Sequence, residues 1–99
     1  MSQQDENLFW QLVEEFINRA NDACEQLDPN MVSAAMMNAT ARFNAFVVAH
    51  ESLDKNEYAE EVDSALNYLT NRYRELAKEH LEDYREHYGD YIGNKSLEE

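Results

Sequence analysis

Arg42 is the residue whose chemistry stands out, because it is the only charged side chain between residues 31 and 50. Asn38 precedes it by one helical turn, and Asn44 follows it by two residues. A guanidinium in apolar surroundings needs an acceptor, since an unpaired buried charge is very costly. Two interpretations are open: an anion-binding site formed by Arg42, Asn38 and Asn44, or an internal ion pair. The candidate partners for the ion pair are Glu14, Glu15 and Asp63.

A metal site is a second possibility, suggested by Glu79, Asp83 and His87 at intervals of four residues. Carboxylates and an imidazole on one helical face are possible zinc or iron ligands. A carboxylate-bridged site in a helical bundle, however, needs inward-facing acids on several helices and Glu-x-x-His motifs, which this sequence lacks. We therefore expect solvated charges here, with no metal and no cofactor.

Nucleophilic catalysis has little support in the sequence. The serines at 33, 52 and 64 lie in no glycine-flanked turn, and no glycine-rich phosphate loop is present. Cys24, the only cysteine, continues an apolar stripe and has no histidine close in sequence, so we expect a buried, unreactive thiol. These features predict a protein that is not an enzyme.

Tyrosine is abundant, with 6 residues in the chain. Core packing explains those that fall on apolar stripes, but tyrosine is also enriched at protein interfaces. The candidate contact surface lies near the end of the last long helix, and its members are Leu81, Tyr84, Tyr88 and Tyr91.

Three helices are expected to position these side chains, over residues 6–27, 30–52 and 55–88. In the first, apolar residues recur at helical spacing from Phe9 to Leu27, after a start that Asp5 or Asn7 can cap. Asp28 and Pro29 end that helix and suit the start of the next. Asp54 and Glu57 resemble a capping box for the third helix.

The second helix is apolar around most of its circumference. One strip contains Val32, Ala35, Met36, Ala39, Phe43, Phe46 and Val47, and a second strip contains Ala34, Ala41, Ala45 and Val48. Such a helix is expected at the centre of the domain, buried between both flanking helices.

The third helix is too long for its neighbours, at about 50 Å against about 30 Å. Val62, Leu66, Leu69, Tyr73, Leu76 and His80 form a coiled-coil-like seam, and Gly89 is expected to stop the helix. The fold class is therefore all-α: a three-helix up-down-up bundle with an overlong third helix, forming a single domain over residues 1–93. Residues 94–99 are expected to be a disordered tail.

The net charge of −13 restricts the class of partner. An acidic surface repels phosphate backbones and anionic lipid, so neither direct nucleic-acid binding nor membrane association is expected. The apolar stretch contains Asn38, Arg42 and Asn44 near its middle, which also argues against a membrane-spanning helix. The N-terminal residues lack the pattern of a secretory signal, so a cytoplasmic location is expected.

The segment Ala39-Thr40-Ala41-Arg42-Phe43-Asn44-Ala45-Phe46-Val47-Val48-Ala49 resembles a family of small proteobacterial proteins classified as a domain of unknown function. The resemblance extends from about Phe9 to about Tyr84. It implies a bacterial cytosolic protein and supplies no activity, substrate or cofactor.

These observations favour a non-catalytic protein–protein interaction module that self-associates through its third helix, as a homodimer or with another protein. Two alternatives stay open. One is an acidic decoy or adaptor that binds a basic partner protein. The other is a small anionic-ligand or enzyme site around Arg42.

Overall fold

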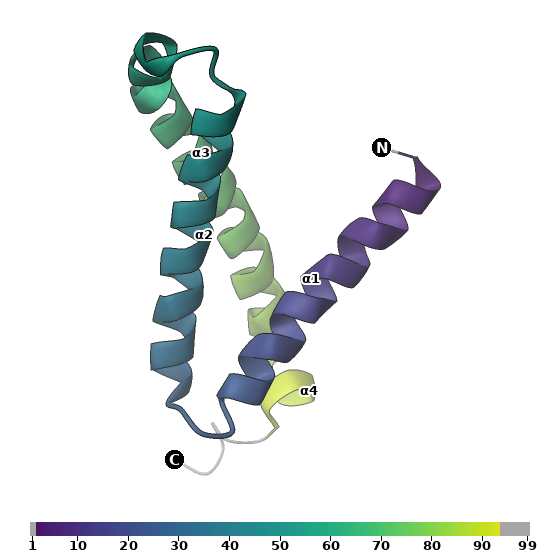
Figure 1. The fold of residues 1–99 in the computed structure, drawn as a ribbon. Coiled ribbons are helices and arrows are strands. Elements are labelled where there is room, and N and C mark those ends of the chain that lie inside the picture. Colours follow the sequence, from purple (N-terminus) through teal and green to yellow (C-terminus); the bar gives the residue numbers. More distant parts are fainter. Residues whose placement is uncertain (1, 94–99) are drawn as a thin grey trace. The chain divides into compact units, whose positions relative to one another are not determined.

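The computed structural model describes residues 2–93, which fold into helices without strands. The long helices are α1 (Gln3–Ala23), α2 (Pro29–Glu51) and α3 (Lys55–Glu86), and a short helix, α4 (Tyr88–Ile92), follows (Figure 1). The predicted all-α class is confirmed. The short fourth helix was not predicted, and the predicted tail at 94–99 lies outside the described residues.

The chain divides into two compact units. The first, Met1–Glu51, contains α1 and α2, which form a helical hairpin (Figure 1). The second, Ser52–Glu99, contains α3 and α4. The single domain and the up-down-up arrangement of the three long helices stay predictions.

Helix α1 begins three residues before its predicted start. The Ser2 hydroxyl accepts a hydrogen bond from the Asp5 backbone N–H at 3.1 Å, so Ser2 caps the helix in place of Asp5 or Asn7. Asp5 and Glu6 then lie in the first turn, where carboxylates favour the positive end of the helix dipole. The regular helix ends at Ala23 rather than residue 27, because short-range turn bonds such as Gln26 N–H to the Ala23 carbonyl tighten the chain.

The starts of α2 and α3 follow the sequence prediction. The Asp28 carboxylate accepts from the Asn30 N–H at 2.7 Å, with Pro29 in the first helical position. At α3, the Asp54 carboxylate accepts from the Glu57 N–H at 2.9 Å. The Glu57 side chain reaches back to the Leu53 N–H at 3.4 Å, one residue before the cap. Local side-chain chemistry therefore sets both helix starts.

Burial is the main difference from the sequence prediction. Among residues 2–93, Val32 alone is buried, at 7% exposed. It lies near the turn between α1 and α2, where Ala20 and Ala23 are half-buried, and the two helices diverge from that turn (Figure 1). The expectation that α2 is buried on nearly every side is therefore not met within the α1–α2 unit. Cys24 is also exposed, because the chain has already left the regular helix at that residue.

Candidate functional site

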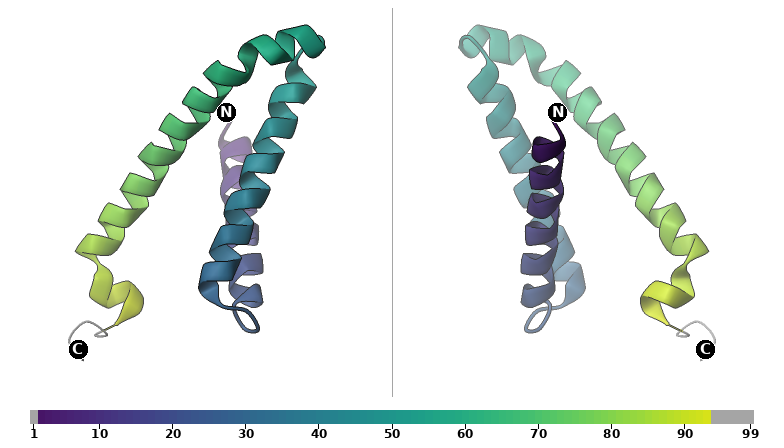
Figure 2. Two further views of the ribbon diagram at one scale, coloured as in Figure 1. Left: turned by 90° about the vertical axis from the view of Figure 1, so that its left-hand side faces the viewer. Right: turned by 90° about the vertical axis from the view of Figure 1, so that its right-hand side faces the viewer.

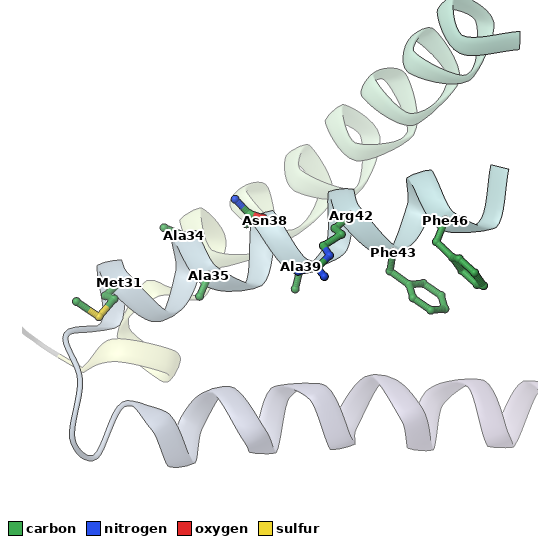
Figure 3. A pocket seen from close by; sticks show the side chains of 8 residues that line it. All are labelled: Met31, Ala34, Ala35, Asn38, Ala39, Arg42, Phe43 and Phe46. Carbon is green, nitrogen blue, oxygen red and sulfur yellow. The ribbon is translucent and has the colours of Figure 1, made fainter. Parts of the chain in front are cut away.

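Arg42 and Asn38 share an open groove along α2, which we call the Arg42 groove. It has a volume of about 910 Å³ and is lined by Met31, Ala34, Ala35, Asn38, Ala39, Arg42, Phe43 and Phe46. Phe43 and Phe46 project toward the side on which α1 lies, whereas Asn38 projects away from it (Figure 3). The groove is mostly apolar, with one cation and one amide at its edge.

All lining residues of the groove come from a single helix. A groove with one wall cannot surround a small molecule as a typical ligand pocket does. Asn44 is half-buried and does not line the groove, because residues two apart lie on different sides of a helix. The structure thus brings together Arg42 and Asn38 of the predicted anion site, and leaves Asn44 out.

Arg42 has no carboxylate partner in its own unit. Within residues 2–51 it forms no ion pair with Glu14 or Glu15, although both acids are on the neighbouring helix. That version of the internal ion pair is not found in the structure, where Arg42 is exposed. The version with Asp63, a residue of the second unit, stays a prediction.

A second groove runs along the other flank of α2. It has a volume of about 780 Å³, and its lining residues are Asn30, Ser33, Ala34, Met37, Asn38, Ala41 and Arg42. Arg42 and Asn38 therefore lie on the boundary between two apolar surfaces of one helix. This position lies on open surface rather than inside an enclosed pocket.

A tyrosine cluster occupies the junction of α3 and α4. The rings of Tyr84 and Tyr91 are 4.4 Å apart between centroids, and the Tyr91 hydroxyl donates to the Asp83 carboxylate at 2.7 Å. His87 Nδ1 lies 3.2 Å from the other oxygen of the same carboxylate. Helix α4 turns away from the axis of α3 (Figure 2), and these contacts tie it to the last turns of α3.

The hydrogen bond to Asp83 raises the pKa of Tyr91 above its usual value. Deprotonation would remove the donated proton and place a phenolate beside a carboxylate, so the neutral tyrosine is favoured. Partial desolvation and the charges of Asp83 and Asp90 act in the same direction. The cluster is therefore held together by a neutral tyrosine at physiological pH.

The predicted stop at Gly89 is wrong, because the helical geometry breaks at His87 and Gly89 lies inside α4. Gly93 adopts φ of +88°, the left-handed region that glycine tolerates, and ends α4 instead. The predicted contact residues Tyr84 and Tyr91 are thus brought together by a fold-back. Sequence reasoning missed Asp83 and His87 as the residues that hold it, although their spacing of four was visible.

Leu81 remains the most exposed of the predicted contact residues, at 71%, while Tyr84, Tyr88 and Tyr91 are exposed to smaller degrees. Earlier in α3, the exposed seam residues are Val62, Leu66, Tyr73 and Leu76.

In the part of the chain that the structure describes, no group of three His, Cys, Asp or Glu side chains could hold a metal ion. Among residues 2–93, no helix is both long and apolar enough to cross a membrane.

Comparison with known proteins identifies the family but no function. No curated protein and no solved structure gave a match to the chain. One family model does match, over residues 9–85, and its description is "Protein of unknown function (DUF3144)". This span agrees with the extent of the resemblance found in the sequence. The chain therefore belongs to the family of proteins of unknown function described as DUF3144.

Proposed function

We propose that this chain is a non-catalytic protein–protein interaction module that self-associates through α3 in the bacterial cytoplasm. The observation that supports the proposal is the exposed apolar surface on α3, where the seam runs from Val62 to Leu76 and a second, rotated line carries Leu81 and Tyr84. Monomeric proteins rarely leave a long contiguous apolar surface in water, and such a surface is typical of a protein contact.

The spacing of the seam favours another helix as the contacting element. The seam residues recur at alternating steps of four and three, the spacing that lets two helices pack knobs into holes. The tyrosine cluster extends the same end of α3 with rigid aromatic surface. Tyrosine supplies contact area together with a polar hydroxyl, which suits an interface with a wet rim.

The test is the mass of the protein in solution. We expect sedimentation equilibrium at tens of micromolar to give about twice 11.6 kDa. Leu81→Glu should return the mass to 11.6 kDa, because it adds a charge at the most exposed large apolar residue of α3. A monomeric wild-type chain at that concentration would contradict the proposal.

Leu53→Glu is the matched control. Leu53 is 88% exposed and lies in the connector before α3, away from the seam. The same chemical change there should leave the mass unchanged. If both variants lower the mass equally, general charge repulsion and not the α3 surface controls association.

A second candidate is an anionic partner or ligand at Arg42, favoured by the absence of an ion pair for Arg42 within its unit. This candidate predicts that carboxylate or phosphate compounds shift the amide resonances around Asn38 and Arg42. The remaining alternative, an acidic adaptor for a basic protein, predicts binding that weakens steeply with added salt.

A further inference from the structure

Helix α2 exposes more apolar surface than any single neighbour can cover. Phe43, Phe46 and Met37 are 62%, 56% and 57% exposed, and every alanine of the helix is exposed as well. Phe43 and Phe46 project toward the α1 side (Figure 3), yet α1 approaches α2 closely only around Val32, near the turn. Most of the helix is therefore without a covering element in the hairpin.

The exposed residues form two strips separated by polar positions. The first, on the Arg42 groove, carries Phe43 and Phe46, and the second carries Met37 and Ala41 on the opposite flank. A packed helix covers one strip of its neighbour, roughly 100° wide. Within residues 2–51, α1 covers neither strip beyond the region of Val32, so both strips are open to further helices.

Charge indicates which occupant can cover these strips. The chain carries a net charge of −13, so two copies repel each other over most of their surface. Helix α2 is the exception, since it contains no acidic residue from Pro29 to His50. Its one cation, Arg42, lies at the edge of both strips, and a second copy offers many carboxylates to pair with it. Two acidic copies can therefore approach each other best through α2.

The exposed area is sufficient for a stable contact. Five large side chains on α2 (Met31, Met36, Met37, Phe43 and Phe46) together expose about 500 Å², taking about 190 Å² for each whole side chain. Two copies would then bury about 1,000 Å², and the exposed alanines bring the total into the range of about 1,200–2,000 Å² found for specific interfaces. The alanines also allow a second helix to approach closely.

We propose that a second copy of this chain packs on α2, so that the homodimer is built on this helix as well as on α3. This inference rests on the self-association proposed above and names the surface where the second copy binds. The α2 surface consists of Met31, Met36, Met37, Phe43 and Phe46 with the intervening alanines, and Arg42 and Asn38 form its rim.

The first test uses the unmodified chain, because three of its 4 methionines lie on α2. A mixture of ¹³C-methyl-methionine protein and unlabelled protein is examined for NOEs between the two copies. We expect NOEs from the Met36 and Met37 methyl groups to protons of the unlabelled copy. A dimeric sample whose methionine methyl groups show contacts only within their own chain overturns the inference and leaves the α3 proposal intact.

The second test compares Met37→Glu with Leu53→Glu. Leu53 is 88% exposed and lies in the connector after α2, so the two variants add the same charge on and off the proposed surface. Met37→Glu should give a mass of 11.6 kDa, and Leu53→Glu should remain a dimer. If Met37→Glu stays dimeric while Leu81→Glu dissociates, α3 alone holds the dimer and the inference fails. If Met37→Glu dissociates and Leu81→Glu does not, the inference stands and the proposed role of α3 fails.

Discussion

Replacing Phe43 by alanine should weaken self-association strongly while leaving the helix intact. The Phe43 ring lies on the Arg42 groove, 62% exposed, with its centroid 5.7 Å from that of Phe46. Its only ring neighbour among the described residues is on the same helix, so a second copy can cover most of its surface. Alanine has a higher helix propensity than phenylalanine, and the substitution therefore does not disfavour α2 itself.

The expected magnitude follows from the exposed area. With about 200 Å² for a whole phenylalanine side chain, the 62% exposed fraction is about 120 Å². Complete coverage would contribute about 3 kcal/mol for each ring at about 25 cal/mol per Å². If a second copy covers half of that area, the two rings of a dimer contribute about 3 kcal/mol together. The dissociation constant should then rise by about 100-fold.

Sedimentation velocity over a dilution series measures this change directly. Leu53→Ala is the control, because Leu53 exposes a larger fraction of its side chain, 88%, in the connector away from α2. It should leave the dissociation constant unchanged. A value for Phe43→Ala within about threefold of wild type would refute the argument, since it would mean that the second copy does not cover the ring. A loss of unfolding free energy without a change in the dissociation constant would mean that the ring is covered within its own chain.

Three further predictions concern the local contacts. Asp54→Ala removes the α3 cap and should lower the free energy of unfolding by about 1 kcal/mol, measured by urea denaturation, whereas Glu57→Gln keeps the cap and should cost less. In a spectrophotometric titration, the pKa of Tyr91 should lie above the ordinary tyrosine value of 10.0, and Asp83→Asn should lower that pKa toward normal. The Tyr91 pKa is raised in the folded state, so its stabilising effect is fully present below the unfolded pKa and is lost as pH rises through the folded pKa. Arg42→Gln should change the free energy of unfolding by less than about 0.5 kcal/mol, whereas loss of a buried ion pair would cost about 3–5 kcal/mol.

The local elements could be predicted well from the sequence. The starts of α2 and α3 depend on Asp28 and on the Asp54–Glu57 pair, and both sets of side chains act on backbone groups two to four residues away. The start of α1 was misplaced because Ser2 is the better cap and lies before the first apolar residue.

The candidate sites were predicted only in part. Arg42 and Asn38 share a groove because they are one helical turn apart, and that relation is already present in the sequence. The Tyr84–Tyr91 contact was missed, since it requires the chain to break at His87 and fold back onto Asp83. The break brings residues of two helices into contact, and the periodicity of a single helix does not predict such a contact.

The sequence alone determined the all-α class, the three long helices and the absence of acidic residues along α2 before Glu51, because capping, periodicity and charge are local properties of the chain. Tertiary structure decided which apolar faces are covered. Burial depends on the neighbour that each face meets, and the α1–α2 hairpin covers Val32 while leaving Phe43, Phe46 and Met37 in water. An apolar helix can be covered by its own chain or by another copy, and the same residue pattern serves both.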